Sequence, residues 1–375
     1  MSRVTHISII HIPLDTRIFE KQCRALAAAG YDVHLVVADP PVAEIDGVQL
    51  HSIADDCDRP PARKQWRRML RAARWAFRLR PSVYHLHDPH LIPLGLVLKL
   101  AGARVLYDVH EDYPAHGRTK LAGRPLRAEL KAFMWGLLER LARIGLDGFV
   151  CASPAVARRF PAAKASVVTN FPLHREFGLR ANGSTLPYRR RPNTVVYMGD
   201  ITVARGFWEM IRAVELVPER LGCRLLLAGR FRDAHLEQPA AALAAARRIE
   251  YVPYRPYRQA VSKLSAAKVG LILLHPLPNH WDPWRSNKLF EYMGAGLPVI
   301  ASDLPRWREL VVGTGCGLVA DPRDASSIAS AIEYLLDHPE EAEEMGRRGR
   351  EAVRARFNWD GQEARLLSIY REIAA

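Results

Sequence analysis

The sequence has few of the features that mark secreted or membrane-spanning proteins. Its five cysteines are scattered, odd in number and never spaced as CxxC, which excludes a disulfide framework and argues against a zinc site. No apolar run approaches the length of a membrane span, and the apolar stretch in "MSRVTHISIIHIP" is too short for a signal peptide. We therefore expect a soluble or peripheral protein of the cytosol.

Two common nucleotide-binding signatures are also missing. The chain has no P-loop, and no complete GxGxxG follows the first strand-like run, which disfavours P-loop NTPases and dinucleotide-dependent oxidoreductases. With 375 residues, 49% of them hydrophobic, the chain can nevertheless bury two cores, so we expect two domains.

Strand-like runs alternate with helix-like runs along the chain. "HISIIHIP", "YDVHLVVAD", "SVYHLHD", "RVLYDVHED" and "GFVCASP" come first, and "NTVVYMGD", "CRLLLAGRF", "IEYVPY", "VGLILLHP" and "LPVIASD" follow a segment rich in turn formers and arginine. Helices are predicted between them, including 206–217, 234–248 and 257–267. This pattern predicts two doubly wound, Rossmann-like α/β domains in tandem. We place the first domain at 1–170, a linker at 171–193, the second domain at 194–355, and at 356–375 a C-terminal helix that packs back on the first domain.

Polar side chains follow the strands predicted for the first domain. They are His11 with Asp15 and Arg17, then His87 and Asp88, then His110, Glu111 and Asp112, and finally Ser153. Because ligands of open parallel sheets bind beyond the carboxyl ends of the strands, we expect these groups to converge on one rim that binds hydroxyl groups and handles protons. Taken singly, each residue is equally compatible with a turn or a core position.

Small residues and cations follow the strands of the second domain. They are Gly199, Arg205 with Gly206, Gly229 with Arg230, and the helix start at 287–291. Small residues let a ligand approach the backbone and cations neutralise anions, so this edge predicts a diphosphate pocket.

The block "NKLFEYMGAGLPVIASD" (287–303) combines a helix start with two charges. Asn287 can cap a helix whose apolar residues, Leu289 among them, face a core, and the glycines can end it before a buried strand. Lys288 beside helix N-terminal amides suits an anion, and Glu291 suits a hydroxyl-bearing ligand. A surface ion pair between the two charges is the alternative interpretation.

The formal charge of +14 is unevenly distributed. Residues 1–200 hold 30 Lys and Arg against 18 Asp and Glu, whereas residues 201–375 hold 24 against 22. The densest segment, 59–80, has nine basic residues and no acid. On a helical wheel one of its faces is apolar (Trp66, Met69, Leu70, Ala73, Phe77) and the other is basic (Arg63, Arg67, Arg71, Arg74, Arg78).

A basic amphipathic helix of this kind suits an anionic membrane surface. The alternative is a solvated helix whose apolar stripe packs on its own domain. Nucleic acid is a weaker interpretation, because the chain shows no recognition-helix or aromatic-basic RNA motif.

In their order along the chain, these segments resemble the retaining glycosyltransferase family 4 (glycosyl transferases group 1). The resemblance runs from "DTRIFEKQCRALAAAGYDVHLV" through "VLYDVHEDYP" and "YMGDITVARGF" to the 287–303 block and "CGLVADPRD". It implies the GT-B fold, in which two Rossmann-like domains face each other across a cleft. It also implies a hexosyltransferase that uses a UDP- or GDP-linked sugar, retains the anomeric configuration and needs no divalent metal.

The resemblance implies roles for the donor-binding residues. Glu291 would hold the ribose hydroxyls, and Arg205 would meet the diphosphate in place of the usual lysine. Lys288 would make a second diphosphate or sugar contact. The remaining donor-binding positions would be Gly199, Gly229, Asn287 and Leu289.

On the first domain, His110 corresponds to the family histidine that reaches the transferred sugar. Asp15 and Asp88 are candidates for the base that activates the acceptor. One position departs from the family pattern: Pro283 stands eight residues before Glu291, where many members have a glutamate. The acid that usually binds the sugar is therefore missing or supplied otherwise, for example by Asp282.

The sequence thus predicts a glycosyltransferase that extends a glycan acceptor, carried on a polyprenyl diphosphate, at the inner face of the cell membrane. Cell-surface polysaccharide would be the product, and nucleic acid would not be a partner. Two alternatives remain open. A nucleotide-sugar epimerase can share this architecture, and a basic membrane-binding or nucleic-acid-binding protein would need no catalysis.

Overall fold

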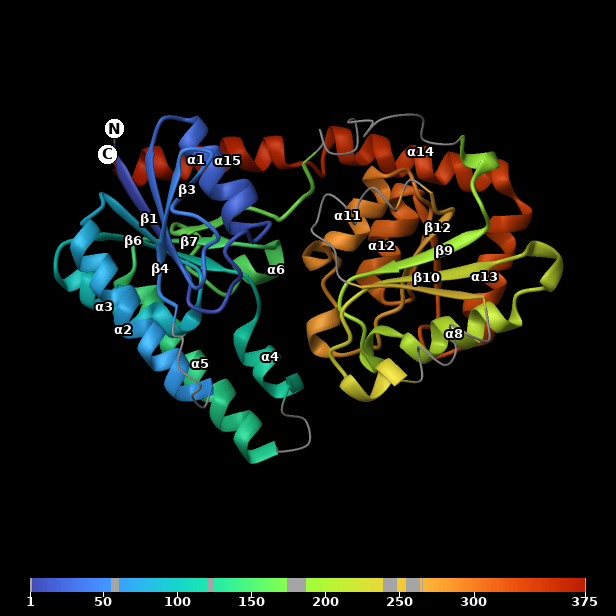
Figure 1. Cartoon of the computed structure of the whole chain (residues 1–375), viewed down its shortest axis with the longest axis horizontal. Coiled ribbons are helices and arrows are strands. Elements are labelled where there is room, and N and C mark those ends of the chain that lie inside the picture. The colour runs from blue at the N-terminus through green and yellow to red at the C-terminus, as the bar shows by residue number, and fades with distance from the viewer. Residues whose placement is uncertain are drawn as a thin grey trace. The chain divides into compact units, whose positions relative to one another are not determined.

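The protein folds into two compact units, each built on its own parallel sheet (Figure 1). The structure is a computed structural model that describes residues 2–54, 61–120, 125–173, 187–238, 248–253, 264 and 266–374. The first unit comprises Met1–Asn170 and Trp359–Ala375, and the second comprises Phe171–Asn358.

The first unit contains an eight-stranded sheet in the order β3-β4-β2-β1-β5-β6-β7-β8. Its strands are β1 (Arg3–Ile7), β2 (Asp32–Val37), β3 (Glu44–Ile45), β4 (Val48–Ser52), β5 (Val83–Leu86), β6 (Arg104–Val109), β7 (Gly148–Cys151) and β8 (Ala165–Val167). All neighbouring strands pair in parallel except β3 with β4. Strands β5 and β7 are buried along their whole length, because helices cover both faces of such a sheet.

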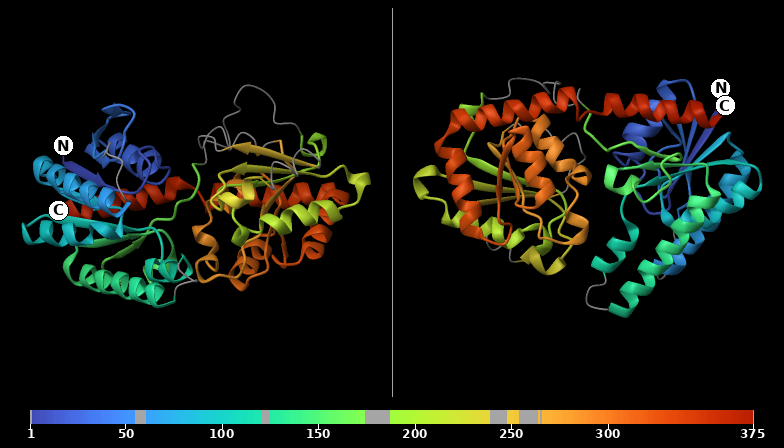
Figure 2. Two further views of the ribbon diagram at one scale, coloured as in Figure 1. Left: turned by 60° about the horizontal axis from the view of Figure 1, so that its bottom comes forward. Right: turned by 180° about the vertical axis from the view of Figure 1, so that it is seen from behind.

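The helices of the first unit divide between the two faces of its sheet (Figure 2). They are the π-helical turn η1 (Ile18–Cys23), α1 (Arg24–Ala28), α2 (Pro61–Leu79), α3 (Ile92–Leu100), α4 (Tyr113–Lys120), α5 (Pro125–Gly145), α6 (Pro154–Ala157) and α15 (Trp359–Ala374). The chain runs one way across the sheet from β1 to β2 and the other way from β5 to β8. Right-handed crossovers therefore place η1 and α1, on which α15 packs, opposite α2, α3 and α5.

The second unit contains a six-stranded, all-parallel sheet in the order β11-β10-β9-β12-β13-β14. Its strands are β9 (Thr194–Met198), β10 (Arg224–Gly229), β11 (Ile249–Pro253), β12 (Val269–Ile272), β13 (Val299–Ser302) and β14 (Gly317–Ala320). One apolar cluster packs α8 (Phe207–Leu216) and α13 (Ala325–Asp337) on one face; a second packs α11 (Asn287–Gly294) and α12 (Pro305–Thr314) on the other. Helix α14 (Pro339–Ala355) packs against α11.

Two doubly wound units confirm the predicted fold class. Helix α2 forms where the basic amphipathic helix was expected, and α15 belongs to the first unit. The helices predicted at 234–248 and 257–267 lie mostly outside the described residues, as does most of the segment proposed as a linker. The described ends of that segment are not free: Phe171 and Tyr188 are buried in the second unit, because large aromatic side chains complete its cores.

Each sheet has one point where the chain reverses its direction of winding. In the first sheet this point lies between β1 and β5, and in the second between β9 and β12. The carboxyl ends of the strands at such a point leave a crevice where ligands of doubly wound sheets bind. No helix among the described residues is long and apolar enough to cross a membrane.

Candidate active site

Asp88, directly after β5, anchors the loop that follows β1. Its carboxylate is fully buried; Oδ2 accepts hydrogen bonds from the Ile9 amide (2.6 Å) and the Ser8 hydroxyl (3.1 Å). The other oxygen lies 3.1 Å from Nδ1 of His11. Burial would lower the pKa of His11, but this carboxylate outweighs it and the pKa is raised. Burial would likewise raise the pKa of Asp88, but the bond from His11 lowers it.

Asp88 is therefore an enclosed carboxylate that orients His11 and favours the charged form of its ring. The structure favours this role over that of a base in direct contact with an acceptor.

His110 follows β6 and lies beside His11, with ring centres 4.8 Å apart. Its Nε2 is 3.3 Å from Oδ2 of Asp108, a buried carboxylate within β6. Asp108 also pairs with the Arg17 guanidinium (2.6 Å) and accepts a hydrogen bond from Gln22 Nε2 (2.7 Å). Although burial opposes ionisation, Arg17 and the histidines hold the pKa of Asp108 well below its usual range. The buried Asp108–Arg17 ion pair thus holds the Nε2 side of the His110 ring from inside the unit.

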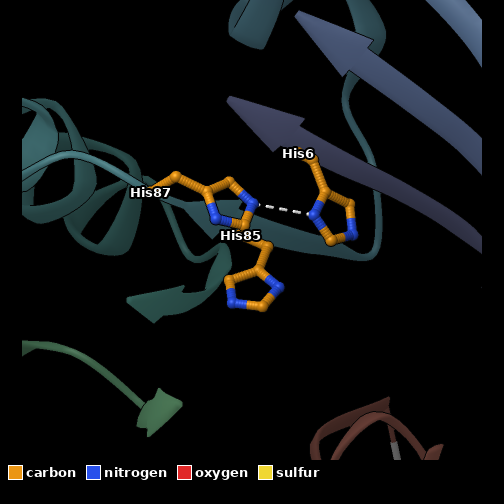
Figure 3. A group of neighbouring side chains, drawn as sticks. All are labelled: His6, His85 and His87. Carbon is orange, nitrogen blue, oxygen red and sulfur yellow. Dashed lines mark hydrogen bonds between the residues drawn. The ribbon is translucent and has the colours of Figure 1, made fainter. Parts of the chain in front are cut away.

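Three more histidines lie behind this edge, inside the unit (Figure 3). Nδ1 of His6 is 2.9 Å from Nε2 of His87, and the Tyr370 hydroxyl lies 3.1 Å from Nε2 of His6 and 2.8 Å from Nδ1 of His85. Burial lowers the pKa of His6 and His85 well below their usual value, and that of His87 to about 3. These three rings are neutral, and they connect α15 to Asp108 through the 3.2 Å contact of His87 Nδ1.

Two groups in this network have a geometry that could hold a metal ion. Among the described residues, one consists of His6, His85 and His87, and the other of His87, Asp108 and His110. Several of their nitrogen and oxygen atoms already bond to one another. The expectation that no metal is bound stays a prediction.

In the second unit, two glycines bring β9, β10 and α11 together. Gly199 follows β9 at φ +131° and Gly229 ends β10 at φ +153°, backbone conformations that other residues rarely adopt. A Cβ on Gly229 would meet the Gly199 carbonyl oxygen at 1.8 Å, and a Cβ on Gly199 would meet Cε of Lys288 at 2.7 Å. Gly229 needs to be glycine because the Gly199 backbone lies against it, and Gly199 leaves room for the Lys288 side chain at the end of β9.

Lys288 and Arg205 share this edge of the second sheet. The Lys288 ammonium lies 5.4 Å from the centre of the Tyr197 ring, and Arg205 Nη1 donates to the Asp200 carbonyl at 3.4 Å. Burial, and next the charge of Arg205, lower the pKa of Lys288 to about 7. Burial lowers the pKa of His280 to about 4, and both cations contribute to that shift. Arg205 and Lys288 therefore both act electrostatically at the crevice between β9 and β12.

Helix α11 starts one residue earlier than the capping prediction assumed. Ser286 is its N-cap and Asn287 its first helical residue, so the prediction that Asn287 caps the helix was wrong. Leu289 has a fully buried side chain, and its amide donates to the Ser286 carbonyl at 3.1 Å. Leu289 thus secures the helix start instead of offering a side chain to a ligand. Glu291 lies one turn further and is 7% exposed.

Two other predicted acids form local caps. One oxygen of Asp15 accepts from the amides of Arg17 (2.8 Å) and Ile18 (3.0 Å), at the start of η1. Asp282 accepts from the Trp284 amide at 3.3 Å, at the turn that begins with Pro283. The hydrogen-bond geometry gives Asp15 a structural task and supports no assignment of it as the base.

The structure thus brings His11, Asp88 and His110 together in the first unit. It also brings Gly199, Gly229, Arg205 and Lys288 together in the second. Sequence reasoning missed Asp108 and Tyr370. The available signal for Asp108 was a charge inside the apolar strand "RVLYDV", since an acid at a buried strand position needs a partner.

Several known proteins resemble this chain over about half of its length. Glycogen synthase of Mycobacterium tuberculosis is 25% identical over 187 residues, 48% of this chain and 44% of the relative. Phosphatidyl-myo-inositol mannosyltransferase of Mycobacterium leprae is 25% identical over 191 residues, 50% of this chain and 48% of the relative. The chain therefore aligns with about half the length of these relatives.

Among solved structures, sucrose-phosphate synthase from Thermosynechococcus elongatus superposes with a TM-score of 0.79 at 20% identity. The superposition covers 100% of this chain and 99% of that one. WaaG, a glycosyltransferase involved in lipopolysaccharide biosynthesis, superposes with a TM-score of 0.72 at 14% identity, covering 98% and 99%. These neighbours confirm the GT-B fold class.

Two family models match consecutive parts of the chain. Residues 16–170, almost all within the first unit, match the model described as Glycosyltransferase Family 4. Residues 192–338, within the second unit, match the model described as Glycosyl transferases group 1. The chain therefore belongs to glycosyltransferase family 4, the glycosyl transferases group 1.

Proposed function

We propose that this protein transfers a hexose from a nucleoside diphosphate sugar to a glycan acceptor, with retention of the anomeric configuration and without a divalent metal. The observation that carries the proposal is the crevice of the second unit. There Arg205 and Lys288 lie close enough to depress the pKa of the lysine, beside Gly199. A diphosphate placed between the two cations would relieve their repulsion.

The chemistry of glycosyl transfer explains why such a crevice matters. As the glycosidic bond breaks, negative charge grows on the nucleoside diphosphate leaving group. Fixed cations and the amides at the start of α11 lower the barrier where that charge develops. Glu291, one turn into the helix, would accept hydrogen bonds from the ribose hydroxyls. A UDP- or GDP-linked donor fits these groups, and a similar solved structure from Anabaena was determined in complex with UDP-glucose.

In the first unit, His110 would contact the transferred sugar. The buried Asp108 and His87 hold its ring, so it would meet the substrate with a fixed orientation. His11, whose pKa Asp88 raises, is the adjacent group that could handle a proton or a phosphate of the acceptor.

We further propose that the acceptor is carried on a lipid, such as a polyprenyl diphosphate, and that the protein extends a cell-surface polysaccharide at the inner face of the membrane. Helix α2 supports this, because Trp66, Leu70 and Phe77 are exposed at 59%, 47% and 48% on a helix rich in arginine. Two similar proteins are named for related roles: phosphatidyl-myo-inositol mannosyltransferase and a glycosyltransferase of lipopolysaccharide biosynthesis.

The test begins with thermal shift across UDP-, GDP- and ADP-linked sugars. A ligand at a hundredfold its dissociation constant should stabilise the fold by about 2.7 kcal/mol. The stabilising donor is then incubated with a lipid-linked acceptor, with and without EDTA, and the product is followed by NMR. Turnover that survives EDTA and a product with the donor's anomeric configuration support the proposal. An inverted product contradicts it, and interconversion of the sugar without any acceptor would identify an epimerase.

A further inference from the structure

Helix α5 exposes a continuous stripe of large apolar side chains. The stripe consists of Leu126, Leu130, Phe133, Met134, Leu137, Leu141 and Ile144, between 42% and 88% exposed. At 3.6 residues per turn these positions fall within about 100° of arc, so they form one face along the whole helix. An exposed apolar surface of this length marks an interaction site.

The opposite face of α5 is the one that the first unit buries. Its fully buried residues are Ala128, Ala132, Ala142 and Glu139, all less than 5% exposed, and Trp135 and Leu138 are partly buried beside them. A surface helix normally buries most of its large apolar residues and exposes its small and polar ones. Helix α5 instead turns the seven large apolar residues of the stripe outward, which leaves them available to a partner outside the unit.

Positive charge lies on both sides of the α5 stripe. Arg127 and Lys131 flank it on one side, and Arg140 and Arg143 on the other, as the helical positions dictate. The two acids of the helix are engaged by arginines: Glu129 by Arg118 at 2.8 Å, and Glu139 by Arg159. The stripe is therefore an apolar band between cations.

The neighbouring helices extend this surface. Helices α2 and α3 cover the same face of the sheet as α5 (Figure 2), and α3 packs directly on α5. Helix α2 repeats the reversed arrangement, with Ala72, Ala76 and Leu79 buried while Trp66 is exposed. On α3, Leu100 is 91% exposed. Three adjacent helices thus present apolar side chains among basic ones.

We propose that the α5 stripe inserts into the interfacial region of an anionic lipid bilayer and is the main apolar anchor of the first unit. The inference deepens the proposed function, since it rests on a lipid-borne acceptor and names the surface that brings the protein to it. Charge complementarity favours an anionic membrane over a second copy of the chain. A second copy on a two-fold axis would bring the same cations against each other, whereas anionic headgroups neutralise all of them.

The experiment compares two double variants of the full chain. Leu130→Gln with Phe133→Gln removes the centre of the stripe, in residues 64% and 67% exposed. Leu216→Gln with Val312→Gln is the control on helices of the second unit, at residues 56% and 51% exposed. Both proteins and the wild type are sedimented with vesicles of phosphatidylcholine and phosphatidylglycerol in equal parts, at about 0.15 M salt, where charges are screened over about 8 Å.

The stripe variant should lose at least about tenfold in vesicle partitioning, because burying one large apolar side chain contributes about that factor or more. The control should partition like the wild type. Wild-type protein that stays in the supernatant, or equal partitioning of all three proteins, overturns the inference. A wild type that elutes as a dimer, with a monomeric stripe variant that still binds vesicles, assigns the stripe to a second copy and also overturns it.

Phe133→Trp keeps the inference testable if the double variant does not fold. Because the chain has eight other tryptophans, the emission of the variant is compared with that of the wild type. The added emission should be shifted to the blue and quenched by brominated lipid, and no difference from the wild type overturns the inference. Donor binding, measured on the same preparations by thermal shift, separates the two proposals. Protein that binds nucleotide sugar but not vesicles contradicts only the lipid inference, and protein that binds vesicles but no nucleotide sugar contradicts only the proposed function.

Discussion

At the scale of single residues, Lys288 is the group whose protonation should respond most directly to a donor. With its pKa at about 7, much of it is neutral just above neutrality in the free protein. A bound diphosphate favours the charged form, so binding should take up a proton, and affinity should fall by up to about tenfold per pH unit above about pH 7.

Calorimetry of UDP or GDP binding in two buffers of different ionisation enthalpy measures this proton uptake. Lys288→Met, which keeps the length of the side chain, should abolish the uptake and flatten the pH dependence. An unchanged pH profile in that variant would assign the titration to another group.

Arg205 offers a second prediction at this scale. Arg205→Ala should lower turnover by about ten- to a hundredfold with the fold intact, because a charge-assisted hydrogen bond contributes roughly 1.5–3 kcal/mol. The side chain is only partly buried, so its removal leaves no core cavity. Arg205→Lys should recover part of the loss, and steady-state kinetics with the donor identified by thermal shift checks both variants. Wild-type turnover in Arg205→Ala would remove Arg205 from the site.

Residues at strand ends could be predicted, and residues that support them from inside could not. Arg205, Lys288 and His110 were identified because glycines, turns and motif order point to the ends of strands. The groups behind His110 were not identified. Asp108, two residues before His110, sits inside a strand, and Tyr370, whose hydroxyl contacts His6 and His85, is more than 250 residues further along the chain. Only the folded sheet brings these groups together.

At the scale of the element, α2 should provide the salt-sensitive part of membrane binding. Arg67→Gln, Arg71→Gln and Arg74→Gln together should weaken binding to anionic vesicles by about a hundredfold, since each basic group near such a surface contributes about 1 kcal/mol. Arg68 is kept, because it donates to the Ile9 carbonyl at 3.3 Å and supports the loop before His11. High salt should mimic the triple variant, and donor binding should not change. Vesicle sedimentation across a salt series measures both effects, and salt-independent binding by the wild type would contradict the assignment.

The existence of α2 was predictable, but the face that it buries was not. Trp66, Leu70 and Phe77 suggested either a membrane face or a packing face, and the structure exposes them. Alanine lines the buried face of α2, and alanine contributes little to a hydrophobic pattern. The exposed face of α5 was not predicted for the same reason. A hydrophobic pattern assigns its leucines to a core, whereas in the structure they face outward.

At the scale of the whole molecule, Tyr370 connects the last helix to the first strands. Its hydroxyl bonds one ring nitrogen of each of two buried imidazoles, so Tyr370→Phe should leave those two nitrogens without this partner and lower the free energy of unfolding by about 1–3 kcal/mol. Tyr334→Phe is the matched control, because the Tyr334 hydroxyl bonds only the exposed Glu341 at 2.6 Å among the contacts of the described residues. Calorimetric unfolding of both variants measures the difference. Equal transitions in the two would show that water replaces the lost hydroxyl.

The first unit draws on both ends of the chain, and this has a consequence for biosynthesis. The sequence of the second unit, Phe171–Asn358, leaves the ribosome before Trp359–Ala375 does. The crevice between β9 and β12 can therefore form on the nascent polypeptide. At that stage His6 and His85 still lack their contacts with the Tyr370 hydroxyl. Translation that stops within α15 would release a chain whose second unit is complete but whose first unit lacks the helix that contacts His6 and His85, and such a partly folded chain should be a substrate for quality-control proteases.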